Sequence, residues 1–191
     1  MSIIRTAAAI AVGSLFATAA LAQTAAVPVQ RDINQETRIE QGLRSGALST
    51  REAARLERGE SRIDRVEARD LRNGPLTPQE QARINRMQNA ESRAIYDEKH
   101  NGRYGNPDSL SSQRMQADVQ RNINQERCIQ QGIANGSLND RQVGNLEVGQ
   151  ARVGRAEWRA GRDGWVGGGQ QAHIQNLENR QSNRIFAARH R

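Results

Sequence analysis

The clearest pattern in the chain runs from Arg51 to Arg72, where basic, apolar and acidic residues each recur in steps of three and four. Residues spaced in this way lie along one side of an α-helix, so each kind forms its own row. The basic row is Arg51, Arg55, Arg58, Arg62, Arg65, Arg69 and Arg72. The apolar row is Leu56, Gly59, Ile63 and Val66, and the acidic row is Glu57, Glu60, Asp64 and Glu67. The stretch therefore predicts one long helix with an arginine face.

The pattern returns ninety positions later. The second basic row is Arg141, Arg152, Arg155, Arg159 and Arg162. When 29–100 is aligned on 119–190 without a gap, roughly 29 of about 72 residue pairs are identical, which indicates an internal duplication. The second copy keeps five arginines but has Gln150 and Gly154 where the first has acids. The basic part of the pattern is the part that recurs.

Turn signals divide each copy into three helices. Pro28 suits a helix start, Gly46 suits a helix end, and Ser49 with Glu52 forms the first capping box. A second capping box, Thr77 with Glu80, opens the third helix, and the corresponding turn of the second copy has glycines at 167–169. The expected fold class is therefore all-α, with two tandem three-helix units, or one continuous bundle if the units stack.

The first residues read as an export signal. Arg5 precedes an apolar run that is too short to span a membrane, and Ala20-Leu21-Ala22 is typical of a cleavage site. We expect a signal peptide over 1–22, a leader over 23–28, and helical repeat 1 over 29–100. A linker with the start of the fourth helix follows over 101–118, and helical repeat 2 over 119–191. The predicted location is the periplasm, with no transmembrane span after cleavage.

The basic charge of the chain limits the kinds of partner that it is expected to bind. The chain has 28 basic against 21 acidic residues, and all basic residues but Lys99 are arginine, which favours bidentate pairing with carboxylate or phosphate. Export argues against nucleic acid. The expected partners are proteins or anionic envelope components, and a homo-oligomer is possible. Cys128, the only cysteine, excludes an internal disulfide and is read as a small buried residue or as an intermolecular disulfide.

The arginine rows allow two interpretations. Like charges three and four apart repel, so a row of them favours anions beside it. Internal carboxylates at Glu36, Glu40, Glu80 or Glu91 are one source of negative charge, and an external anionic partner is the other. The remaining carboxylates are expected at the surface.

Other chemistries are poorly supported. The turn from Asn73 to Glu80 resembles the second half of a calcium loop, but Arg69 and Leu71 stand where acidic ligands are needed. His100 and His190 occupy matching helix ends, where a histidine suits the helix dipole. No nucleophile, phosphate-loop or metal motif was identified. We therefore expect no enzymatic activity, no cofactor and no metal.

Several short motifs resemble a family of exported, uncharacterised proteobacterial helical-repeat proteins. They are Ile33-Asn34-Gln35, Gln41-Gly42, Ser45-Gly46-x-Leu48-Ser49, Asn73-Gly74-x-Leu76-Thr77, Ile95-Tyr96 and Lys99-His100-Asn101. Leu76-Thr77-Pro78-Gln79-Glu80 is more distantly similar to the LTXXQ motif of periplasmic stress proteins, with Glu80 where that motif has Gln. This second resemblance implies a small, basic, helical, ATP-independent chaperone or stress modulator.

The sequence thus predicts a non-catalytic periplasmic binding protein, chaperone-like or related to envelope stress. Its arginine faces would bind anionic or unfolded protein partners. Two alternatives stay open: a metal-responsive sensor that uses the calcium-loop-like turns or the histidines, and a purely structural envelope protein.

Overall fold

The computed structural model describes the backbone of residues 17–190 and the side chains of residues 25–190, and within this part every element is helical. The helices are α1 (Ala17–Ser45), α2 (Thr50–Asp70), a 3-10 turn η1 (Leu71–Asn73), α3 (Pro78–Lys99), α4 (Leu110–Ala134), α5 (Asp140–Gly161) and α6 (Gly168–Arg189). The all-α prediction is confirmed. Most of the expected signal peptide lies outside the described residues, and its expected cleavage site falls within α1.

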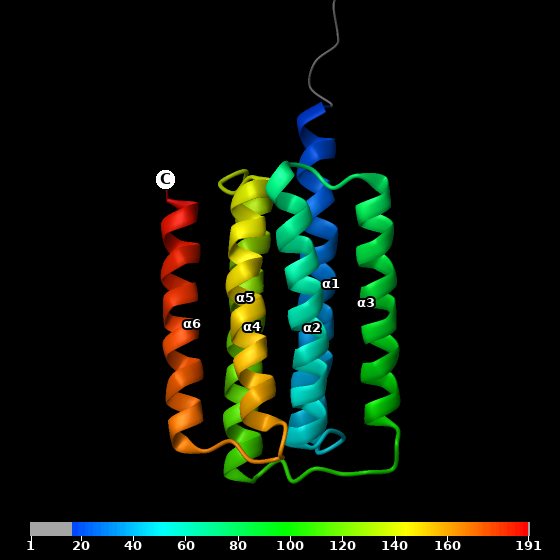
Figure 1. Ribbon diagram of the computed structural model, residues 1–191, viewed down its shortest axis with the longest axis vertical. Coiled ribbons are helices and arrows are strands. Elements are labelled where there is room, and N and C mark those ends of the chain that lie inside the picture. Colours follow the sequence, from blue (N-terminus) through cyan, green and yellow to red (C-terminus); the bar gives the residue numbers. More distant parts are fainter. Residues whose placement is uncertain (1–16, 191) are drawn as a thin grey trace, which may run out of the picture.

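The six helices stand side by side in one continuous bundle. Figure 1 shows α1, α2, α4 and α5 in the centre, with α3 and α6 at opposite edges. The most extensive contacts join α2 to α5 and α1 to α4, so each half of the chain packs against the other through its first two helices. Helices α2 and α5 run in opposite directions, so the first residues of α2 lie beside the last residues of α5 (Figure 1).

Side-chain caps fix where the helices begin. Ser49 accepts a hydrogen bond from the backbone N–H of Glu52, and the Glu52 carboxylate accepts from the Ser49 N–H at 2.9 Å. Thr77 and Glu80 make the same reciprocal pair at the start of α3. Both predicted capping boxes are therefore confirmed. Each satisfies two N–H groups that the first turn of a helix leaves without partners.

The first helix differs from the prediction. Pro28 lies inside α1 rather than at its start, and residues 24–28 are helical rather than a separate leader. Ala25 and Val29 are 1% and 0% exposed, so packing of this turn outweighs the hydrogen bond that proline cannot donate. The carbonyl of Pro28 accepts a hydrogen bond from the Gln88 side chain at 3.1 Å.

The linker between the halves is held against the bundle. Gly46 ends the first turn with a φ of 75°, in the left-handed region expected for it. Its carbonyl accepts a hydrogen bond from the N–H of Gly105 at 2.8 Å. A Cβ on Gly105 would come within 2.4 Å of the Leu48 carbonyl, so only glycine permits this approach.

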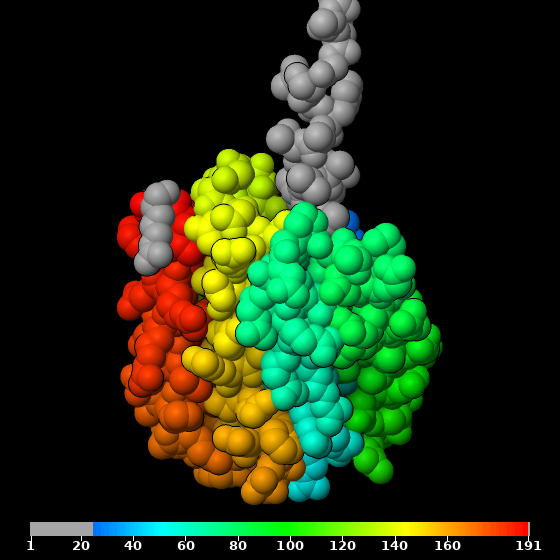
Figure 2. All heavy atoms as spheres, turned by 45° about the horizontal axis from the view of Figure 1, so that its top comes forward, coloured from blue at the N-terminus to red at the C-terminus, as the bar shows by residue number. Residues whose placement is uncertain are grey.

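The outer surface is formed by closely packed side chains from neighbouring helices, as the space-filling view shows (Figure 2). None of the helices in the described part of the chain is both long enough and apolar enough to span a bilayer.

Candidate functional site: an arginine-lined groove beside an acidic interior

The arginine rows of α2 and α5 lie at the surface. All twelve are exposed except Arg155, which is half-buried. Among residues 25–190, only Arg55, Arg69 and Arg162 of these rows lie within 4.0 Å of a carboxylate; their partners are Glu98, Asp70 and Asp163. The expected internal partners mostly face elsewhere. Glu40 pairs with Arg44, Glu80 caps α3, and Glu36 is buried in the interior.

The two rows meet where α2 packs on α5. The guanidinium of Arg58 lies 4.4 Å from the ring centre of Trp158, a cation–π contact across the two helices. Farther along α2, partial burial lowers the pKa of Arg65, and the positive charges of Arg155 and Arg62 lower it further. Arginines from both helices therefore form one surface of like charge.

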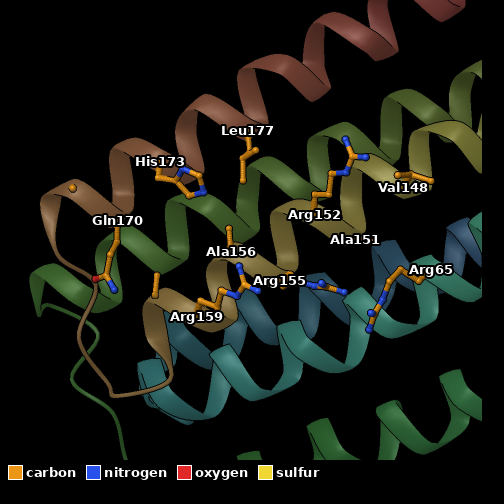
Figure 3. Close-up of a pocket in the computed structure, with 12 residues that line it drawn as sticks. Arg65, Val148, Ala151, Arg152, Arg155, Ala156, Arg159, Gln170, His173 and Leu177 are labelled. Carbon is orange, nitrogen blue, oxygen red and sulfur yellow. The ribbon is translucent and has the colours of Figure 1, made fainter.

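A groove of about 620 Å³ opens beside this surface, between α5 and α6. Figure 3 shows Arg65 on α2, Arg152, Arg155 and Arg159 on α5, and His173 and Leu177 on α6. The remaining lining is small or apolar: Val148, Ala151, Ala156, Ala160 and Gly169, with Gln170 at one end. The groove thus combines an apolar floor with a cationic edge.

No carboxylate in the described residues neutralises this edge. Helix α6 has one acidic residue, Glu178, which is 1% exposed and points into the bundle. Helix α3, at the opposite edge, has Glu80, Glu91, Asp97 and Glu98, and Glu98 pairs with Arg55. The α5–α6 groove therefore brings together four arginines that have no carboxylate partner in the described residues: Arg65, Arg152, Arg155 and Arg159.

The inner side of the same helices corrects one expectation. The acidic row of α2, expected at the surface, is buried: Glu57, Glu60, Asp64 and Glu67 are 0%, 2%, 6% and 0% exposed. Three further acids are buried but have partners at the edge of the bundle: Glu40 pairs with Arg44, Asp70 pairs with Arg69 and Arg83, and Glu52 caps α2. We call the remaining buried set the carboxyl core. It comprises Asp32, Glu36, Glu57, Glu60, Asp64, Glu67, Asp118, Glu126, Glu147, Glu157 and Glu178. Sequence reasoning missed it because the acidic row and the apolar row have the same helical period.

The carboxyl core has almost no compensating positive charge. Of its members, only Glu178 forms an ion pair within residues 25–190, with Arg121 at 3.4 Å. Burial, followed by the charges of neighbouring carboxylates, raises the pKa of Glu57, Glu60 and Glu147 well above the usual range. The pKa of Asp32 rises to about 7 and that of Glu126 to about 8, mainly through burial. The core is therefore largely protonated at neutral pH.

Neighbouring side chains fit protonated carboxyl groups. Glu57 and Glu157 lie within hydrogen-bonding reach of each other, as do Asp32 and Glu67. As carboxylates, neither oxygen of Glu57 has a donor, whereas one shared proton gives the pair a hydrogen bond. At the edges, the Gln88 amide donates to Asp32 at 2.8 Å.

Two glycines allow polar side chains of the outer helices to lie over α2 and α5. A Cβ on Gly59 would meet the Glu91 carboxylate at 1.9 Å, and one on Gly149 would meet the Gln181 amide at 1.8 Å. The Gln181 amide donates to the Leu146 carbonyl at 2.9 Å. At these two glycines, side chains of α3 and α6 therefore approach the backbone of α2 and α5 closely.

The histidines, the cysteine and the remaining acidic residues do not come together in a second site within the described residues. Among the side chains described, no three histidine, cysteine or acidic residues are placed to hold a metal ion. His100 and His190 cap the ends of α3 and α6 and stack on Tyr96 and Phe186, with ring centres 4.1 Å apart in each pair. Cys128 is free and half-buried, packed against the hydrophobic core, and its intermolecular disulfide stays a prediction.

Comparison with known proteins gives no functional guide, since no protein-family model, curated protein or solved structure matches this chain.

Proposed function

We propose that the protein is a non-catalytic, exported binding protein of the periplasm, and that the α5–α6 groove receives an acidic segment of another protein. The observation that carries the proposal is the apolar floor edged by four arginines that lack carboxylate partners in the described residues. Uncompensated arginines favour carboxylate, and the floor favours apolar side chains.

The spacing of the arginines suits a helical segment. Arg152, Arg155 and Arg159 stand three and four residues apart on α5. An amphipathic helix with carboxylates at the same intervals presents them on one face, with apolar residues toward the groove. A client exposing such a segment fits the chaperone-like role that the sequence suggests.

The direct test is the binding of a designed peptide. Its carboxylates stand at positions i, i+3 and i+7 beside a row of leucines, and binding is followed by fluorescence anisotropy at low salt. Arg152→Gln combined with Arg155→Gln should weaken binding about tenfold or more, since each charge-assisted bond contributes on the order of 1.5–3 kcal/mol. The matched control is Arg72→Gln with Arg141→Gln, which changes the same rows outside the groove and should have little effect.

A scrambled peptide with the same composition should bind more weakly, because its carboxylates no longer share one face. Equal weakening by the groove and control variants would contradict the assignment of the site. Binding of anionic lipid vesicles with no binding of the peptide would replace the protein partner with a membrane surface and overturn the proposal.

A further inference from the structure

The carboxyl core has no part in the proposed binding site, yet it occupies the main seam between the two halves of the chain. Helices α2 and α5 approach closely there: Ser61 Oγ donates to the Ala151 carbonyl at 2.9 Å, and a Cβ on Gly154 would lie 3.2 Å from the Glu57 carbonyl. Glu57 and Glu157 face each other across this seam. Buried carboxyl groups therefore lie at the contact between the two halves of the chain.

A small cavity shows how these groups are oriented. Its volume is about 10 Å³, near the minimum for a single water molecule. Its lining comes from all four central helices: Asp32 and Glu36 from α1, Glu57, Glu60, Ser61 and Asp64 from α2, Asn122 and Glu126 from α4, and Gln150 and Gly154 from α5. Both oxygens of Glu57 and of Glu60 lack a hydrogen-bond donor. Such oxygens are costly to bury as carboxylates but can share protons.

Charged groups around the core do not remove this cost. From α4, α5 and α6 it is faced by Asp118, Glu126, Glu147, Glu157 and Glu178, and from α3 by Gln88 and Glu91. The basic side chains that act on these groups are Arg31 beside Asp32, Arg65 beside Asp64, Arg121 beside Asp118 and Glu178, and Arg62 beside Glu91. All four arginines stand at the margins, and toward the centre of the core the donor to Glu157 is a neutral amide, that of Asn122, at 2.9 Å.

The two halves carry a natural substitution series. Positions ninety residues apart hold a carboxyl group in one half and an amide in the other: Asp32 and Asn122, Glu60 and Gln150, Glu178 and Gln88, Glu91 and Gln181. An amide has nearly the shape of a protonated carboxyl group and cannot ionise. The interior therefore accommodates the neutral form at these positions.

We infer that the carboxyl core is a proton-operated latch that holds α2 against α5 when its carboxyl groups are protonated and releases this seam when they ionise. In the protonated state, facing carboxyl groups are joined by hydrogen bonds. Once Glu57 and Glu157 are both ionised, two like charges face each other in the buried seam. The Asn122 amide donates to Glu157, but no donor in the described residues reaches Glu57, and the seam opens to admit water.

Opening also affects the groove, because Arg65 and Arg155 stand on the outer side of the same two helices. This consequence rests on the proposed function, whereas the latch does not. Failure of peptide binding therefore leaves the latch intact, and failure of the latch leaves the groove intact.

The test measures amide hydrogen-exchange protection factors in α2 and α5 between pH 5 and pH 8.5, in buffer with a chelator. Fluorescence of the half-buried Trp158, which adjoins Glu157, gives a second readout. Protection in both helices should fall at least tenfold as the pH rises, and recover on return to pH 5. Protection that is unchanged or higher at pH 8.5 would overturn the latch.

The decisive variant is Glu57→Gln with Glu157→Gln, which keeps the shape of the facing pair but cannot ionise. It should remove at least half of the loss of protection, whereas Asp97→Asn with Asp108→Asn, at exposed positions, should leave the loss unchanged. If the Gln variant loses as much protection between pH 5 and pH 8.5 as the wild-type chain, the proposal is wrong.

Two further measurements use the wild-type chain, so they do not depend on whether the Gln variant folds. In the wild-type chain, carboxyl ¹³C resonances should show a group of glutamates still protonated at pH 6; titration of every glutamate near its ordinary pKa would contradict the latch. Recovery of full protection at pH 8.5 on adding calcium or magnesium would make the core a cation site and overturn its operation by protons.

Discussion

The inner and outer faces of α2 carry different ionisable groups: Glu57, Glu60, Asp64 and Glu67 are buried in the bundle, whereas the six arginines of the helix are exposed. Both sets are ionic in the sequence, yet only the acids are buried. A buried carboxyl group can become neutral by binding a proton, whereas an arginine stays charged at any accessible pH. Acids, unlike arginines, can therefore be buried in the interior of a basic protein without counter-ions.

The largest change in stability should come from replacing ionisable groups of the carboxyl core while the surface arginines are left unchanged. Glu60→Gln, Glu67→Gln and Glu147→Gln together should raise the free energy of unfolding at pH 8 by roughly 1–3 kcal/mol, because deprotonation is no longer possible. At pH 5, where the wild-type groups are protonated, the gain should nearly vanish. Chemical denaturation at both pH values measures this, and a loss of stability at pH 8 would show that the carboxylates are needed in ionised form.

A smaller change in stability is expected where the Gln181 side chain of α6 packs over Gly149 of α5. Gly149→Ala should cost about 1 kcal/mol, because the new Cβ displaces the Gln181 amide from the Leu146 carbonyl. The control is Gly169→Ala, where no atom lies within 4 Å of the added Cβ and the better helix propensity of alanine should stabilise by up to about 1 kcal/mol. If both variants change the melting temperature in the same direction, Gly149 has no special role.

The smallest effect should come from the outer face. Arg62→Gln with Arg65→Gln should change the free energy of unfolding by less than about 0.5 kcal/mol, since exposed charges contribute little and neighbouring arginines repel. Thermal melts at low and high salt measure the change. A loss of several kcal/mol would mean that these arginines hold the fold together and are not available to a partner.

Much of the fold follows from the sequence, but the interior does not. Local chemistry specifies the capping boxes at Ser49 and Thr77 and the left-handed turn at Gly46, so these elements could be predicted from short stretches. The acidic row of α2 could not be assigned to the interior, because helical spacing separates three faces without saying which faces meet other helices. The groove could not be predicted either. It exists because α6 packs beside α5 without exposing a carboxylate there, and the sequence does not show which helices are neighbours.

The central claim, that the interior carboxyl groups are neutral in the folded chain, is tested most directly by the free energy of unfolding of the wild-type protein as a function of pH. Burial raises the folded-state pKa of Asp32 to about 7 and of Asp118 and Glu126 to about 8, whereas unfolded carboxyl groups titrate near 4. Between these values the folded chain binds more protons than the unfolded chain, so the stabilisation is complete below about pH 4 and is lost as the pH rises through about 8. The free energy of unfolding should therefore fall steadily from pH 5 to pH 8.5 in metal-free buffer. A flat or rising curve over this range would show that the interior carboxyl groups are not neutral in the folded chain.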